Sequence, residues 1–318
     1  MTRELHKGDG PPPSDTGGGS PPPTGTGTGS PPPIDFEAET RPVGGGGRYT
    51  LDIPYGWEGA PGVPYGGWTA AVALRAAGLE AQRRRPASVA AQFLRPLSLE
   101  RPLDIDVDVL RRGRRTETIR VSVGQAGKLG VHALVTTAEP AEGLEFEPEV
   151  RPAPPAKDAL PTLGQVIREQ GGDVNDGHHI AHYDYRVPPD RDTRGGRSAD
   201  GRQALVGWIR YGPDVAYDDP FVEGARFLVP ADTQVPAAFL RAGTLGMRDE
   251  RLMRGTTLDL LVHLHRTERS TPWLWYETHV QIAHGGLASG ICNLWSDDGH
   301  LLATSFSQVA FLAAPLRT

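Results

Sequence analysis

Histidines and glycines at short spacings are the first features of this sequence that could support chemistry. His178, His179 and His182 could bind a metal ion, but no cysteine or carboxylate at a suitable spacing completes a zinc site. The pair Gly66-Gly67 precedes an alanine-rich run and would either form a turn or let a ligand or a helix approach the backbone closely. The histidines therefore give little support for a metal centre, whereas the glycine pair remains a candidate for substrate binding.

Arginines form two clusters whose guanidinium groups could bind phosphates. Runs of this kind also occur as charged, solvated faces, and the sequence leaves both interpretations open. The arginines concerned are Arg83, Arg84, Arg85, Arg111, Arg112, Arg114 and Arg115.

Several familiar catalytic motifs are absent. No Gly-x-Ser-x-Gly run occurs, which disfavours a serine-triad hydrolase. No Gly-x-Gly-x-x-Gly or P-loop follows a predicted strand, which disfavours nucleotide-binding folds. Cys292 lies in an apolar predicted strand and is expected to pack rather than to act as a nucleophile. As the only cysteine it excludes an intrachain disulfide and suits a reducing cytoplasm.

Length and charge exclude further classes of protein. The 318 residues suffice for about two domains, and the net charge of -6 argues against nucleic-acid binding. No stretch approaches the ~18 uncharged apolar residues of a membrane span, and the N-terminus lacks the apolar core of a secretory signal. We therefore expect a cytoplasmic protein without a membrane span.

The elements that must position these residues begin after an unusual N-terminal segment. Gly and Pro make up 22 of the first 47 residues, so residues 1–47 are predicted to be a disordered tail. Residues 68–79 are rich in alanine and leucine and predict a buried helix. Residues 103–111 alternate between apolar and acidic side chains, which predicts a half-buried strand. Further strands are predicted at residues 48–53, 86–93, 115–123 and 129–138.

The second half of the chain repeats this order. Residues 139–177 form a connector with one predicted helix at 160–170. A helix is predicted at 230–242, interrupted near Pro236, and Asp297-Asp298-Gly299 predicts a hairpin turn. Strands are predicted at residues 179–187, 204–211, 256–266, 273–283, 286–296 and 301–312. Each half thus reads as one apolar helix packed on several antiparallel strands.

Short motifs in this order resemble the acyl-CoA thioesterase II family. The first half contributes Tyr65-Gly66-Gly67 before the helix and Phe93-Leu94-Arg95-Pro96 after the next strand. The second half contributes Ala231-Asp232, the run of residues 256–259 and the run of residues 298–304. The resemblance implies an α+β fold with two hot-dog modules in one chain, each a curved antiparallel sheet wrapped round one helix. The modules are expected at residues 48–138 and 178–318.

The resemblance also implies the site. In that family an Asp at a helix start, a Thr at the start of the next strand and a Gln in the last strand are catalytic, which here become Asp232, Thr257 and Gln308. An ungapped alignment places Ser307 at the last position, so Gln308 requires a one-residue bulge. Thr256 is hard to separate from Thr257, and Asp232 would also suit a helix N-cap. Gly66, Gly67 and Trp68 are assigned to substrate binding.

The function implied is hydrolysis of acyl-CoA thioesters to a carboxylic acid and coenzyme A, without a metal or an organic cofactor. The alternatives are a non-catalytic hot-dog protein that binds acyl groups and a hot-dog hydratase or dehydratase. Tyr217-Asp218-Asp219-Pro220 matches part of the hydratase pattern, but the histidine that pattern needs does not follow within five residues. The sequence leaves open the acyl length and whether copies of the chain form a homo-oligomer.

Overall fold

The computed structural model describes residues 35–83, 85–147, 152–169, 183–188, 202, 204–212, 217–241, 253–268 and 272–313. Arg84 and the His178, His179 and His182 group lie outside these residues. Within them, no helix has both the length and the hydrophobicity to cross a bilayer. Nor do three metal-binding side chains gather at one point in the described part of the chain.

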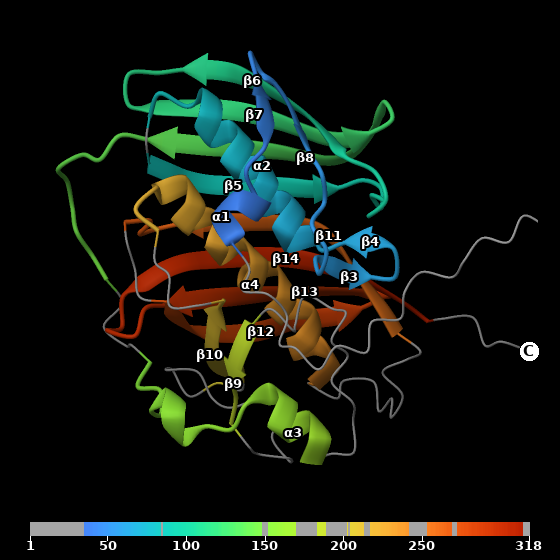
Figure 1. Cartoon of the computed structure of the whole chain (residues 1–318). Helices are drawn as coiled ribbons and strands as arrows, with labels where there is room; N and C mark the ends of the chain where they lie inside the picture. The colour runs from blue at the N-terminus through green and yellow to red at the C-terminus, as the bar shows by residue number, and fades with distance from the viewer. Residues whose placement is uncertain are drawn as a thin grey trace, which may run out of the picture. The chain divides into compact units, whose positions relative to one another are not determined.

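One continuous antiparallel sheet of twelve strands carries both halves of the described chain (Figure 1). The first half supplies β1 (Val43–Gly45), β2 (Arg48–Leu51), β5 (Arg85–Phe93), β6 (Leu103–Arg112), β7 (Thr116–Gln125) and β8 (Lys128–Ala138). The second half supplies β9 (Tyr183–Arg186), β10 (Leu205–Tyr211), β11 (Met253–Leu264), β12 (Trp273–His284), β13 (Leu287–Trp295) and β14 (Leu301–Ala313). A short hairpin of β3 (Glu58–Ala60) and β4 (Val63–Pro64) stands apart.

The strand order confirms the predicted repeat. It runs β1-β2-β6-β7-β8-β5-β11-β14-β13-β12-β10-β9, so the two halves mirror each other across the β5–β11 pair. The alternation in β6 is also as predicted, because Leu103, Ile105 and Val107 are buried between exposed aspartates.

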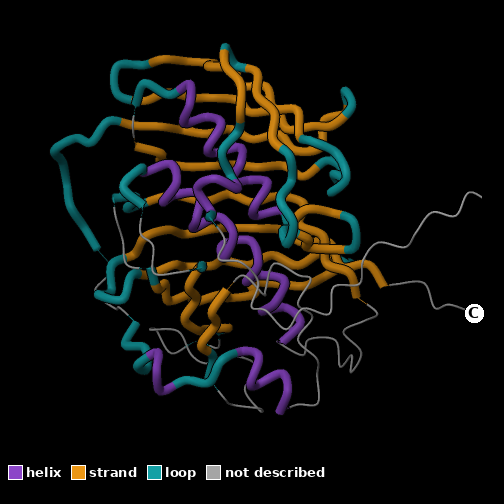
Figure 2. Tube along the Cα trace, in the orientation of Figure 1, coloured by secondary structure: helices purple, strands orange, loops and turns teal. Residues whose placement is uncertain are grey.

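Two long helices, α2 (Gly66–Glu80) and α4 (Pro220–Arg241), lie against the same face of the sheet (Figure 2). Almost every residue of α2 is buried, as its composition predicts. Glycine allows the two helices to pack closely. A Cβ atom at Gly67 would lie 2.9 Å from the Leu228 carbonyl oxygen of α4, and one at Gly78 would lie 2.7 Å from the Phe221 ring.

Helix α4 begins ten residues earlier than the sequence predicts, at Pro220 instead of Pro230. Proline suits the first turn of a helix, and the Asp219 carboxylate accepts a hydrogen bond of 2.8 Å from the Phe221 N–H. Pro230 and Pro236 therefore lie inside the helix, where each removes one backbone donor. The expectation that Asp232 opens this helix is wrong, and so is its interpretation as an N-cap.

The folded part of the chain begins before residue 48. Helix α1 (Phe36–Glu39) places the Phe36 ring in the core, 4.9 Å from the Tyr211 ring and 6.1 Å from the Trp57 ring. Strand β1 pairs with β2 through a glycine turn. The tail predicted for residues 1–47 is therefore wrong for residues 35–47, because a single buried aromatic anchors a glycine-rich segment.

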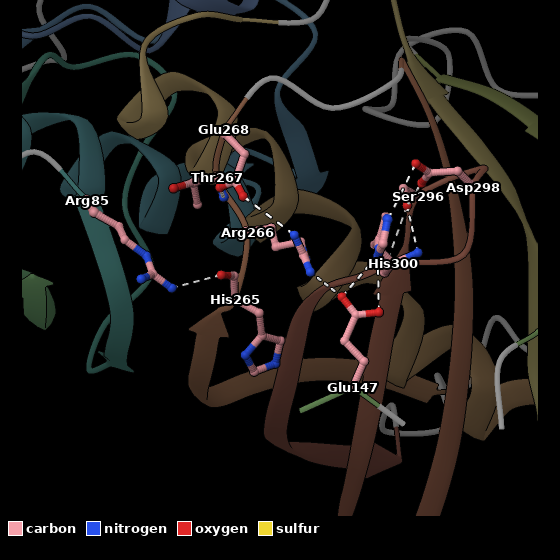
Figure 3. A network of polar contacts seen from close by, with 9 residues as sticks. All are labelled: Arg85, Glu147, His265, Arg266, Thr267, Glu268, Ser296, Asp298 and His300. Carbon is pink, nitrogen blue, oxygen red and sulfur yellow. Dashed lines mark hydrogen bonds and ion pairs between the residues drawn. The ribbon is translucent and has the colours of Figure 1, made fainter. Parts of the chain in front are cut away.

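The connector between the halves bonds to the second half through Glu147 (Figure 3). The Glu147 carboxylate accepts hydrogen bonds from the Arg266 guanidinium and from His300 Nδ1, the latter at 3.0 Å. Arg85 of β5 donates to the His265 carbonyl at 2.9 Å and thus joins the two halves. Further along the connector lie the 3₁₀ helix η1 (Lys157–Ala159) and α3 (Leu163–Glu169), the latter at the predicted place.

Candidate active site

A cavity of about 510 Å³ opens where the start of α2, the middle of α4 and the start of β11 meet. The β3–β4 hairpin and the loop after β5 complete its wall. Apolar side chains dominate the lining, and Asp232 supplies a carboxylate to it. A largely apolar cavity with a few convergent polar groups is typical of a substrate site.

Asp232 is buried, with 1% of its surface exposed, and lines this cavity from α4. Its Oδ1 atom accepts a hydrogen bond of 2.8 Å from the Thr257 hydroxyl, and its carboxylate also accepts one from the Gly67 N–H. Burial raises the pKa of Asp232 to about 6, although these two hydrogen bonds and a third from the Tyr65 side chain favour the ionised form. At neutral pH the side chain is thus a carboxylate that can take a proton from water.

A bulge in β11 turns Thr257 towards Asp232. Thr257 pairs with Val309 of β14 but Asp259 pairs with Gln308, so Leu258 is an extra residue in β11. In a regular strand without the bulge, Thr257 and Asp259 would lie two residues apart and therefore on the same outer face. Bulges commonly re-aim a side chain next to an active site. Of the two threonines, Thr257 contacts Asp232, whereas Thr256 is exposed.

The N-terminal end of α2 faces the Asp232 carboxylate. The N-cap residue, Tyr65, makes no side-chain cap, and the Gly67 N–H donates to Asp232 instead. The first N–H groups of a helix lack intrahelical partners and carry positive potential. A Cβ atom at Gly66 would lie 3.0 Å from Asp232 Oδ2, so a larger residue there would push the carboxylate from its position. The predicted assignment of Gly66 to the substrate site is supported by its place in the cavity wall.

Tyr65 and Thr233 belong to the same wall and were not identified from the sequence. The Tyr65 hydroxyl lies 2.5 Å from Thr233 Oγ1, and Thr233 in turn donates to the Val229 carbonyl at 2.8 Å. Burial and the nearby Asp232 charge raise the pKa of Tyr65 well above its ordinary value, which keeps its hydroxyl neutral. The sequence offers only one indication that they belong to the site. Tyr65 adjoins Gly66 and Thr233 adjoins Asp232, and both of these neighbours are predicted site residues.

Gln308 does not reach the cavity. In β14 Ser305, Ser307 and Val309 are buried towards the helices, whereas Phe306 is exposed and Gln308 shares its face. The bulge predicted for residues 304–307 is absent there and lies in β11 instead. Gln308 is held by its backbone N–H, which donates to Asp259 Oδ1 at 3.2 Å. Ser307 takes the helix-facing position, and its buried Oγ has no hydrogen-bond partner among the described residues.

Gln308→Ala is therefore expected to keep acyl-CoA hydrolysis within about two-fold of the wild-type rate, because substitutions on an outer face rarely change free energies by more than ~0.5 kcal/mol. Steady-state thiol release measures this directly. The Ser307→Ala variant, which changes the same strand on its inner face, is the parallel sample. If Gln308→Ala lost as much hydrolysis rate as an Asp232 variant does, Gln308 would have to be a catalytic residue after all.

Two other candidates belong to the core. Trp68 is fully buried, stacks on Trp57 with ring centroids 5.8 Å apart and does not line the cavity, so its assignment to substrate binding is not supported. Cys292 is buried in β13, and burial raises its thiol pKa to about 12, which disfavours a nucleophilic thiolate.

Three arginines of the two clusters, Arg83, Arg85 and Arg112, bind carboxylates or carbonyls of the chain itself. Arg83 pairs with Glu139 at 2.6 Å, and Arg112 pairs with the buried Glu117 at 2.5 Å. None of the seven arginines named above that the structure describes lines the cavity, whereas Arg95 does so from the loop after β5. Arg95 is therefore the cation best placed to meet a phosphate of a bound ligand.

Comparisons with known proteins agree with this architecture. The family model of the acyl-CoA thioesterase N-terminal domain matches residues 53–138, and that of the acyl-CoA thioesterase C-terminal domain matches residues 149–312. A search of curated proteins returns no match.

Solved structures match nearly the whole chain at low identity. The acyl-CoA thioesterase II TesB2 from Mycobacterium marinum is 19% identical, with a TM-score of 0.70 over 90% of this chain and 100% of its own. The tesB protein of Mycobacterium avium subspecies paratuberculosis is 21% identical, with a TM-score of 0.67 over 87% and 98%. A conserved hot dog fold protein of unknown function from Alicyclobacillus acidocaldarius is 19% identical, with a TM-score of 0.65 over 87% and 98%. The predicted pair of hot-dog modules is confirmed.

Proposed function

Because the chain belongs to the acyl-CoA thioesterase family and hydrolyses acyl-CoA thioesters to a carboxylic acid and coenzyme A, we propose that the reaction takes place beside Asp232. The observation that carries this proposal is a carboxylate, buried in a cavity wall, with a pKa raised to about 6. A base of this pKa is largely ionised at neutral pH and still basic enough to assist water.

In the proposed reaction the Asp232 carboxylate takes a proton from a water molecule while the water oxygen attacks the thioester carbonyl. Thr257 orients the carboxylate through its hydrogen bond to Oδ1. The oxyanion that develops on the carbonyl is stabilised by the N-terminal end of α2, whose first-turn N–H groups other than that of Gly67 supply donors and positive potential. The C–S bond then breaks, and coenzyme A leaves as a thiol after receiving the proton from Asp232.

A single turnover in ¹⁸O-labelled water tests whether water is the nucleophile. With enzyme in excess over one acyl-CoA, attack by water places ¹⁸O in the carboxylic acid during the first turnover. Attack by the Asp232 carboxylate would form an anhydride, and its hydrolysis at the enzyme carbonyl would leave the first product unlabelled. We expect labelled acid, read by mass spectrometry. Unlabelled acid would overturn the general-base role, and release of no thiol would contradict the thioesterase activity itself.

Thr257→Val is expected to move the acidic limb of the pH–rate profile to higher pH. Loss of the hydroxyl donor removes a bond that favours the carboxylate, so the pKa of Asp232 rises above about 6. Hydrogen bonds to charged groups contribute ~1.5–3 kcal/mol, so the ionised fraction of Asp232, and with it the rate at pH 7, falls by roughly two- to fifteen-fold. Thr257→Ser keeps the donor and serves as the matched control. An unchanged limb in Thr257→Val would show that this bond does not act on the reacting group.

We place the enzyme in the cytoplasm, in the turnover of acyl-CoA. Cys292, the only cysteine, is buried as a free thiol, which suits a reducing compartment.

A further inference from the structure

Helix α4 carries a proline one turn after the proposed base. Pro236 follows Asp232 by four positions, so the two residues lie on the same face of the helix, and both line the cavity of about 510 Å³. In an α-helix the N–H of each residue donates to the carbonyl oxygen four residues earlier. Pro236 has no N–H, so the main-chain carbonyl of Asp232 lacks its usual donor.

Nothing outside the helix replaces this missing donor. Among the described residues, no loop N–H and no side chain donates to the Asp232 carbonyl. The carbonyls of a helix point towards its C-terminal end, so this carbonyl points along α4 towards Pro236. Both residues belong to the cavity wall, and the wall therefore offers a hydrogen-bond acceptor next to the carboxylate of the proposed base.

The Asp232 carbonyl lies on the side of the base that leads to solvent. Asp232 itself is buried, Pro236 is partly exposed, and Thr256, which lines the cavity from the start of β11, is exposed. The lining that α2 and β8 supply is closed, since Thr69 and Val131 are both buried. The thiol portion of a substrate must extend to solvent, so it passes Pro236, whereas the closed part of the cavity receives the acyl group.

We propose that the Asp232 main-chain carbonyl, left free by Pro236, accepts a hydrogen bond from the amide N–H nearest the sulphur of coenzyme A. This rests on the proposed function, because the thioester carbonyl must lie at the Asp232 carboxylate. Two methylene groups separate the thioester sulphur from that amide nitrogen. A thioester held at the carboxylate therefore brings the amide N–H within reach of the carbonyl of the same residue, and Pro236 acts as a positioning residue.

Pro236→Ala supplies the N–H that the helix lacks. The new donor pairs with the Asp232 carbonyl and competes with the substrate amide. KM for an acyl-CoA is expected to rise by roughly two- to ten-fold with kcat little changed, because a hydrogen bond made equally to the bound substrate and to the transition state contributes to KM alone. The melting temperature is expected to rise, since alanine is far more favourable than proline inside a helix.

Two thioesters that differ only at the proposed donor give the decisive comparison. Butyryl-N-acetylcysteamine carries the amide, and the butyryl thioester of 2-acetoxyethanethiol has an ester oxygen in place of the N–H. The wild type is expected to prefer the amide by roughly two- to ten-fold in kcat/KM, which is the effect of one hydrogen bond. Pro236→Ala and the bulkier Pro236→Val, which both supply the N–H, should bring this ratio close to one.

Pro230→Ala is the matched control. It is the same change in the same helix, at a buried position that does not line the cavity, and it keeps the wild-type ratio. The ratio cancels any shift of Asp232 itself, which would affect both thioesters alike. A wild type without preference for the amide would overturn the inference. So would a preference that survives in either Pro236 variant, or one that is lost in Pro230→Ala as well.

Competitive inhibition separates this inference from the proposed function. The inhibitors are thioethers of N-acetylcysteamine and of 2-acetoxyethanethiol with a butyl group in place of the acyl group, and their binding does not depend on which residue is the base. Tighter binding of the amide compound that is lost in Pro236→Ala supports the acceptor, even if Asp232→Asn were to stay active. Equal inhibition constants in the wild type would overturn the acceptor, even with Asp232→Asn inactive.

Discussion

Asp232→Asn lowers kcat for acyl-CoA hydrolysis by ~10²–10⁴-fold while the protein stays folded, because removal of a positioned general base typically has an effect of this size. Asparagine keeps the shape of the side chain and can still accept the Gly67 N–H, and the Thr257 hydroxyl can rotate to accept from the new amide. Thiol release in the steady state gives kcat, and circular dichroism confirms the fold. Full activity in a folded variant would exclude the role assigned to Asp232.

The same substitution should raise stability at neutral pH. Folding raises the pKa of Asp232 from 3.8 to about 6, so between these values the folded state binds more protons than the unfolded state. The free energy of unfolding of the wild type therefore falls as pH rises through this window, by up to about 3 kcal/mol. Asparagine has no such titration. In urea unfolding experiments, the free energy of unfolding of Asp232→Asn should exceed that of the wild type above pH 6. This difference should vanish below pH 4. A constant difference across that range would contradict the raised pKa.

Gly67→Ala is expected to damage both stability and catalysis. The new Cβ would lie 2.9 Å from the Leu228 carbonyl oxygen, 2.9 Å from the Val229 Cα and 3.0 Å from the Asp232 Cβ, and backbone cannot move aside as a side chain can. Overpacking of this kind costs ~1–3 kcal/mol, against which the better helix propensity of alanine offsets up to ~1 kcal/mol. A displacement of the Gly67 N–H from Asp232 of about 1 Å would lower kcat by up to ~10²-fold.

Gly78→Ala is the matched control for that substitution. Gly78 lies in the same helix but at its other end, and its new Cβ would lie 2.7 Å from Cγ of the buried Phe221 ring, away from Asp232. We expect a loss of stability of similar size but an unchanged kcat, as read by thermal unfolding and by thiol release. Equal loss of kcat in both variants would mean that α2 affects the site only through general packing.

The sequence predicts the sheet and α2 well because their signals are local. Alternation in β6 and an unbroken alanine-rich run in α2 report burial directly. Asp232 and Thr257 are also found together, since their motifs begin at recognisable points of the second half.

The missed features depend on contacts between distant segments. Pro230 looks like the start of a helix, yet α4 continues through it because the helix is packed against α2 and the sheet. The bulge beside the site lies in β11, whereas we predict it in β14. The sequence around either strand carries no signal that distinguishes an extra residue in one strand from an extra residue in its partner. Phe36 is an isolated aromatic in a glycine- and proline-rich stretch, so its burial against Tyr211 cannot be read from its neighbours.

The pH dependence of kcat/KM in the wild type and in Asp232→Asn tests the central claim most directly. The wild-type profile should fall with a slope of one below pH about 6, because protonation of Asp232 removes the base. The residual activity of Asp232→Asn should lack that limb. Phosphate groups of the substrate also titrate near pH ~6, but their titration would change kcat/KM in the same way for the wild type and for Asp232→Asn. A limb of the same pKa and slope in the two profiles would contradict the account, because the titrating group would then not be Asp232.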